Sequence, residues 1–241
     1  MPADELSTGG VPVDALTILA EADIELEGRM PWSSNATFLV SLGDTGGQAI
    51  YKPVRGERPL WDFEPGLHRR EVAAYLLSEA MGFQVVPPTV LRDDGPLGEG
   101  SLQWFVAADH REHYFTIAER RPELHSQLRD IAVLDIVANN TDRKSGHCLL
   151  ARDDSIWGID HGLCFASDFK LRTVIWEFGG ETIAPALLRA VEPLARAVPD
   201  ALAELLDDHE VVALRRRTEA ILERGTFPLD TSGHRYPWPL V

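Results

Sequence analysis

The sequence has 241 residues, of which 44% are hydrophobic and 25% are charged, and its formal net charge is −15 at pH 7. This composition is typical of a globular protein with one domain, or with two lobes around one cleft. The acidic total argues against general nucleic-acid binding and against docking on anionic lipid, because both need surfaces rich in lysine and arginine.

The N-terminal segment and the cysteines predict a cytoplasmic protein. Residues 1–12 are polar and acidic, so we expect a flexible tail without the basic and apolar regions of a signal peptide. No apolar run approaches the ~20 residues of a transmembrane helix. Cys148 and Cys164 lie in apolar runs without CxxC or metal-binding spacing, which predicts buried thiols.

The first half of the chain predicts a mostly antiparallel sheet with one packed helix. Apolar residues before Gly82 recur at helical spacing, and β-rich runs flank glycine-containing turns. The expected elements are a helix over residues 13–22, strands over 36–42 and 49–54, a helix over 67–81, and strands over 90–92 and 101–107.

The second half is mainly helical. Its expected elements are a helix over residues 124–139, strands over 148–151 and 156–159, and helices over 183–198, 200–206 and 210–224. The resulting fold class is α+β, with two lobes around a cleft. We expect one domain overall, divided into a flexible tail (1–12), an N-lobe (13–107), a C-lobe (108–225) and an irregular tail (226–241).

The stretch from residue 135 to residue 165 carries the strongest chemical signal. Polar side chains follow the expected helix directly, and a strand pair then ends on Asp160, His161 and Gly162. Asp142, His147 and Asp160 are therefore expected at neighbouring ends of these elements, where carboxylates suit Mg²⁺. The structural alternative is that Asp142 and Asp160 do no more than stabilise turns. Two aspartate-bearing turns separated by a hairpin favour the functional interpretation.

Three further positions have both a functional and a purely structural interpretation. Lys52, in a β-rich run, either binds an anion or extends along an edge strand to solvent. Glu71, beside the apolar stripe of its helix, either pairs with Lys52 or is a solvated carboxylate. The small polar residues within 30–37 can present backbone N–H groups to phosphates, although no Walker motif is present.

As an ordered set, these pieces resemble the phosphatidylinositol 3-/4-kinase family, and most closely the type II phosphatidylinositol 4-kinases. The order is a small-polar loop, a strand lysine, a helix glutamate, the Asp142-Arg143 loop, and Ile159-Asp160-His161-Gly162. The resemblance covers residues 28–166 and implies a minimal two-lobed protein-kinase-like fold.

The resemblance also implies roles for individual residues. Asp142 and Arg143 stand in the catalytic loop, Lys52 is the phosphate-binding lysine, Glu71 orients it, and Asp160 binds metal. Further ATP contacts are implied for the phosphate loop and for the hinge that meets adenine. These are Ser33, Ser34 and Asn35 in the loop, and Gln103, Trp104, Phe105 and Val106 in the hinge.

The cofactors implied are ATP and Mg²⁺, and the reaction is transfer of the γ-phosphate to a hydroxyl group. His147 stands where kinases place a metal-binding asparagine, which predicts weak activity or a preference for Mn²⁺. No basic segment follows Asp160, which argues against an inositol-lipid substrate, so the expected acceptor is a soluble small molecule or a protein.

Three alternatives stay open at this stage. The first is a nucleotide-binding pseudokinase that regulates a protein partner, and the second is a kinase-fold enzyme that transfers AMP. The third is a zinc hydrolase that uses His147, His161 and aspartates, although no ligand spacing specifies it.

Overall fold

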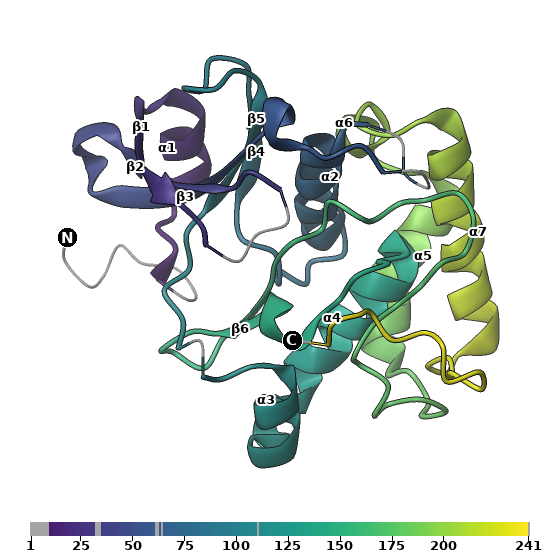
Figure 1. The fold of residues 1–241 in the computed structure, drawn as a ribbon. Coiled ribbons are helices and arrows are strands. Elements are labelled where there is room, and N and C mark those ends of the chain that lie inside the picture. Colours follow the sequence, from purple (N-terminus) through teal and green to yellow (C-terminus); the bar gives the residue numbers. More distant parts are fainter. Residues whose placement is uncertain (1–9, 32–34, 61–62, 64, 110, 241) are drawn as a thin grey trace.

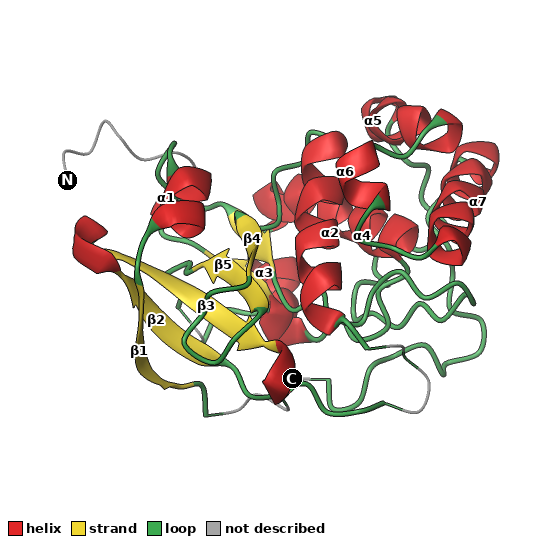
Figure 2. Ribbon diagram, turned by 90° about the horizontal axis from the view of Figure 1, so that it is seen from above, coloured by secondary structure: helices red, strands yellow, loops and turns green. Residues whose placement is uncertain are grey.

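The computed structural model describes residues 10–31, 35–60, 63, 65–109 and 111–240. Strands gather in one part of the molecule and helices in the other (Figures 1 and 2). Five strands form an antiparallel sheet in the order β1-β2-β3-β5-β4. Their bounds are Ile24–Arg29 for β1, Phe38–Leu42 for β2, Gly47–Pro53 for β3, Thr89–Arg92 for β4 and Gly100–Trp104 for β5.

The alternation of side chains along strand β3 determines which face of the sheet carries Lys52. Burial alternates along it, and Ala49 and Tyr51 are fully buried in a cluster that includes Leu19 of α1 (Ala15–Glu21). Because successive side chains in a strand point to opposite faces, Ile50 and Lys52 lie on the other face of the sheet.

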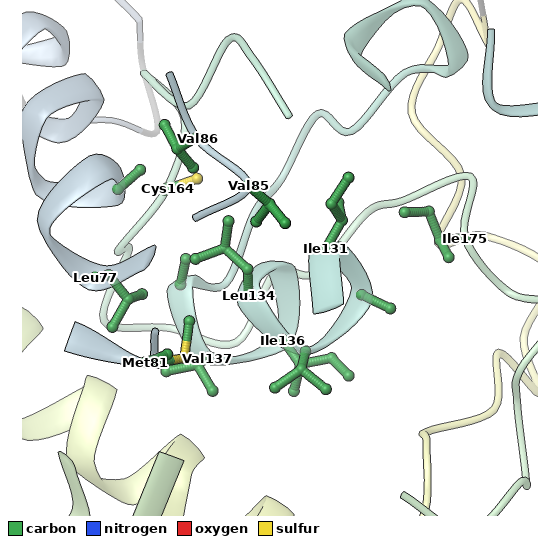
Figure 3. Packing of buried hydrophobic residues seen from close by; sticks show 14 of the residues in the cluster. Leu77, Met81, Val85, Val86, Ile131, Leu134, Ile136, Val137, Cys164 and Ile175 are labelled. Carbon is green, nitrogen blue, oxygen red and sulfur yellow. The ribbon is translucent and has the colours of Figure 1, made fainter. Parts of the chain in front are cut away.

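Helix α2 (Leu67–Ala80) joins the sheet to the helical part. It contacts β4, β5 and α4 (His125–Ala138). Several of its buried residues, among them Ala73 and Leu77, belong to the large hydrophobic cluster of the helical part, and Figure 3 shows Leu77 of α2 and Val137 of α4 among the residues of this cluster. This shared packing fixes the position of α2 between the two parts.

The helical part contains α3 to α7 and one small hairpin. The remaining bounds are Tyr114–Arg120 for α3, Cys148–Leu150 for β6, Ile156–Gly158 for β7, Pro185–Arg196 for α5, Asp200–Ala203 for α6 and Asp208–Arg224 for α7. The last two turns of α4 are buried on all sides, and α7 packs against α4 and α5. Both cysteines are buried free thiols, as expected.

The expected class is confirmed, and the predicted hairpins and long helices form within a few residues of their predicted bounds. Two elements were missed: β1, an edge strand that is mostly exposed, and α3, which has only 7 residues. The strand expected over 101–107 ends at Trp104, and the helix expected over 200–206 ends at Ala203.

The C-terminal tail contacts the helical part. Within residues 227–240 the structure has no helix or strand, in line with the expected irregular tail. The backbone N–H of Ser145 donates to the carbonyl of Leu240 at 2.9 Å, and that of Thr173 donates to Arg235 at 3.0 Å. The expected tail over 1–12 lies largely outside the described residues. Among those described, no helix has the length and apolarity to cross a membrane.

Candidate active site

Lys52 connects the sheet to the loop that follows β7. Its Nζ donates to Glu71 Oε1 at 2.5 Å and to Asp160 Oδ1 at 2.8 Å. These three residues come from β3, from α2 and from the loop after the β6–β7 hairpin. The predicted pairing of Lys52 with Glu71 is present, and the lysine does not extend freely to solvent.

Glu71 is the fixed partner in this arrangement. Its side chain is 4% exposed. Its carboxylate also accepts the backbone N–H groups of His161 at 2.9 Å and of Gly162 at 3.1 Å. Helix α2 is therefore tied to the Asp160 loop through the backbone as well as through Lys52, and charge-assisted hydrogen bonds of this kind are the stronger ones.

The electrostatics keep Lys52 and Asp160 ionised. Burial disfavours the charged form of Lys52, but Asp160 and Glu71 outweigh it and raise the pKa of the lysine. Lys52 in turn holds the pKa of Asp160 well below its usual range, against burial. Asp160 stands at φ 61°, a left-handed conformation that is uncommon for a residue with a side chain. Its carboxylate remains half exposed, and it is therefore accessible to a cation.

Asp142 lies beside this cluster at the end of the segment that follows α4. Its backbone N–H donates to Asn140 Oδ1 at 2.9 Å, and Lys144 Nζ lies 3.1 Å from its Oδ2. Burial raises the pKa of Asp142; Lys144 opposes this shift and Asp160 adds to it. A carboxylate made more basic in this way is suited to accept a proton from a hydroxyl group.

Arg143 occupies a different position from the one its predicted catalytic role requires. Its side chain is fully buried, and its guanidinium donates to both oxygens of Asp135 on α4, at 2.9 and 2.8 Å. The other donors reach the carbonyls of His147 and Ile159 and Nε2 of His161. All five N–H donors of a guanidinium are thereby used within the protein. Arg143 is thus bound internally, beneath the loop that carries Asp142.

His147 faces Asp160 with one ring nitrogen. Its Nδ1 accepts the backbone N–H of Lys144 at 3.3 Å, so the neutral ring carries its hydrogen on Nε2, which lies 3.4 Å from Asp160 Oδ2. Burial lowers the pKa of His147 to about 4, against the attraction of Asp160. In this tautomer the nitrogen nearest to Asp160 is a donor rather than a metal ligand.

Four of these side chains, those of Lys52, Glu71, Asp142 and Asp160, line one cavity of about 250 Å³ between the sheet and the helical part. Its walls include Asn35, Lys52, Glu71, Asp142 and Asp160. Ser33 and Ser34 of the predicted phosphate loop lie outside the described residues. Asn35 is described, and its Oδ1 accepts the backbone N–H of Arg58 at 3.1 Å.

The predicted hinge residues do not line this cavity. Gln103 is buried and donates to Thr89, while the backbone N–H groups of Trp104 and Phe105 donate to Pro88 and Gln48. Val106 is also buried. A second cavity of about 530 Å³ begins directly after the hinge, at Ala107, and is lined by Leu150 of β6.

The described residues contain no group of three histidine, cysteine, aspartate or glutamate side chains that could hold a metal ion. His161 is fully buried and its Nε2 accepts from Arg143 Nη2 at 2.7 Å, so this nitrogen is not free to bind zinc. The hydrogen bond from Arg143 therefore removes one of the two histidine ligands on which the zinc-hydrolase alternative depends.

Sequence reasoning missed Lys144 and Asp135, which support the site. Lys144 was overlooked because no predicted role required it, although it stands two residues after Asp142. Asp135 lies within the helix expected over 124–139. Its signal was available, because a buried carboxylate needs a cation and Arg143 lies 8 residues further on.

Comparison with known proteins identifies the class. Two solved structures share the fold, both at low sequence identity. The proinflammatory kinase CtkA of Helicobacter pylori has a TM-score of 0.55 at 12% identity, over 87% of this chain and 94% of that one. Fam20 of hydra, in a structure with sugar, has a TM-score of 0.61 at 15% identity, over 92% and 93%. The two-lobed kinase-like fold is confirmed.

The sequence matches are more specific. The family model "Phosphatidylinositol 3- and 4-kinase" matches residues 67–215. Protein Rv2133c of Mycobacterium tuberculosis is 39% identical over 266 aligned residues, covering 94% of this chain and 95% of that protein. Phosphatidylinositol 4-kinase gamma 3 of Arabidopsis thaliana is 31% identical over 176 residues, covering 58% of this chain but only 29% of the plant protein. The chain belongs to the phosphatidylinositol 3- and 4-kinase family.

Proposed function

We propose that this protein is an ATP-dependent kinase that transfers the γ-phosphate to a hydroxyl group of a soluble small molecule or of a protein. The observation that carries the proposal is the double ion pair of Lys52 with Glu71 and Asp160. These ion pairs hold the ammonium group of Lys52, on the sheet, against the half-exposed carboxylate of Asp160, in the helical part. Phosphoryl transfer needs positioning and charge neutralisation of this kind more than covalent chemistry.

Each residue has a role in this reaction. Lys52 binds phosphate oxygens and Glu71 keeps it oriented. Asp142 accepts the proton of the acceptor hydroxyl, for which its raised pKa is suited, and Lys144 holds that carboxylate in place. Arg143 acts as a positioning residue, because its bonds fix the backbone on both sides of the site.

The residues present fit a divalent cation. Asp160 supplies an ionised, accessible carboxylate, and Asp142 lines the same cavity. A bound Mg²⁺ would supply charge neutralisation for the phosphate oxygens. Asn35, with Ser33 and Ser34, would contact the phosphates. The adenine contact expected of residues 103–106 would fall to backbone groups other than the N–H groups of Trp104 and Phe105, which are already bonded.

The geometry of His147 favours one second candidate, a nucleotide-binding regulatory protein. Its Nε2–H group points at Asp160, where a metal-binding kinase residue would present an oxygen. If this 3.4 Å contact between His147 Nε2 and Asp160 Oδ2 persists with nucleotide bound, only one metal is held and transfer is slow.

Turnover of ATP labelled at the α- or the γ-phosphate tests the proposal. Wild type should release ADP slowly with Mg²⁺ or Mn²⁺, and Asp160→Ala should not. Asp44→Asn, at the exposed turn after β2, is the matched control. Phosphatidylinositol vesicles belong among the acceptors tested, because the plant relatives are phosphatidylinositol 4-kinases by name.

The outcomes separate the candidates. Transfer of the α-label to an acceptor, with release of pyrophosphate instead of ADP, would mean that the protein transfers AMP. Binding of ATP without turnover would support the regulatory role. If wild type binds no ATP in the presence of either Mg²⁺ or Mn²⁺, the kinase assignment of this cavity is wrong.

A further inference from the structure

A large cavity of the described structure lies apart from the Lys52–Asp160 site. It has a volume of about 700 Å³ and is formed by α7, the end of α4, the segment after Gly162 and the start of the C-terminal tail. Residues of the lining include Ile136 on α4, Phe169, and Arg217 on α7. Figure 1 shows α7 in yellow-green beside α4 in teal.

The lining is cationic in a strongly acidic protein. Arg216, Arg217 and Arg224 line the cavity, against one acidic residue, Glu223, in a chain whose net charge is −15. All four lie on α7, at spacings that bring Arg217 and Arg224 to one face two turns apart. A cationic helix end would account for Arg224 alone, because a helix favours positive charge in its last turn.

Arg217 is the residue that indicates a ligand. It is only 8% exposed. Its Nε donates to the carbonyl of Val137 at 2.8 Å and its Nη1 to that of Ala166 at 3.1 Å, while its Nη2 is buried and has no partner among the described residues. A buried donor without an acceptor is unfavourable, and a buried charge even more so. An anion in the cavity would accept a hydrogen bond from Nη2 and would neutralise the charge of the guanidinium.

The electrostatics of Arg217 agree with this geometry. Burial lowers the pKa of its guanidinium to about 10, although Cys164 and Glu210 oppose the shift. Glu210 is itself bound to Arg70 at 2.6 Å, so it does not neutralise Arg217 alone.

Much of the remaining wall is apolar. Ile136, Ile221 and Pro228 line the cavity together with Phe169, whose side chain is half exposed. Arg235 of the tail stacks over the Phe169 ring, 5.1 Å from its centroid. The ligand that fits these walls therefore carries an apolar group next to its negative charge.

We propose that this cavity binds an organic anion, with its phosphate or carboxylate on Arg217, Arg216 and Arg224 and its apolar part against Ile136 and Phe169. The site is additional to the nucleotide site. The same chemistry occurs in soluble phosphate esters and in the headgroup region of anionic lipids.

Calorimetric titration with hexyl phosphate tests this directly. Wild type should bind it saturably, and the double variant Arg216→Gln/Arg224→Gln should bind it roughly tenfold more weakly or worse, because charge-assisted hydrogen bonds are lost. Both side chains are exposed, so the variant should fold, as circular dichroism will show. Arg189→Gln, an exposed position on α5, is the matched control and should bind like wild type.

Two further experiments distinguish the cavity on α7 from the Lys52–Asp160 site, and a lipid ligand from a soluble one. Lys52→Ala should retain hexyl phosphate binding, since Lys52 lines only the other cavity. Sedimentation with phosphatidylcholine vesicles, with and without phosphatidic acid, distinguishes a lipid source from a soluble one. The inference is wrong if neither probe binds, if the double variant binds as wild type does, if Lys52→Ala abolishes binding, or if hexyltrimethylammonium binds equally well.

Discussion

Replacement of Arg143 by methionine should destabilise the fold severely. The substitution leaves the Asp135 carboxylate, which is 1% exposed, without its cation, and leaves the acceptors on His147, Ile159 and His161 unpaired. Removing one partner of a buried ion pair costs about 3–5 kcal/mol. We therefore expect the free energy of unfolding, measured by urea denaturation, to fall by about this amount.

A double-mutant cycle separates this pair from general damage to the core. Asp135→Asn keeps an acceptor for Asn140 but removes the charge. The double variant should be more stable than the sum of the two single effects predicts, by roughly 1–3 kcal/mol. The reasoning is refuted if Arg143→Met costs less than about 1 kcal/mol or if the two effects simply add.

Three other predictions concern the site and the tail. Lys52→Ala should weaken ATP binding by roughly 10- to 100-fold in equilibrium dialysis, since a charge-assisted contact is lost. Burial lowers the pKa of His147 to about 4 in the folded protein, so below about pH 6.5 the unfolded chain binds more protons than the folded one. The folded state therefore loses stability as the pH is lowered. Between pH 7.5 and 5.0 wild type should lose about 2 kcal/mol more than His147→Gln in urea denaturation. Deleting residues 234–241 removes the acceptors of two buried N–H groups, on Ser145 and Thr173, and should cost about 1–3 kcal/mol for each in the same assay; no change would contradict the tail's contribution.

The order of the elements was readable from the sequence because local signals and tertiary packing agree. The β-rich run after the glycine-containing turn predicted β3, and apolar residues at helical spacing over 67–81 predicted α2. Strand β1 was not predicted, because an edge strand needs little apolar alternation and most of its side chains are exposed.

Within the site, residue types were readable but their directions were not. The pairing of Lys52 with Glu71 follows from side-chain periodicity, whereas the second bond to Asp160 depends on a left-handed backbone at Asp160. The side chain of Arg143 is a similar case. A sequence shows an arginine after Asp142, but only the structure shows that its side chain turns inward to Asp135.

The cavity on α7 was not foreseen at all. Its arginines read as solvated charges on an amphipathic helix, and the sequence does not show which of them packing will bury. Arg217 becomes notable only when its burial and its unpartnered Nη2 are known.

Equilibrium binding of ATP with and without Mg²⁺ tests the central claim most directly. The claim is that Lys52 and Asp160 form a metal-dependent nucleotide site. Wild type and the Asp44→Asn control should bind ATP more tightly when Mg²⁺ is present, and Asp160→Ala should lose that metal dependence. Equal ATP affinity in all three proteins, with or without Mg²⁺, would contradict it.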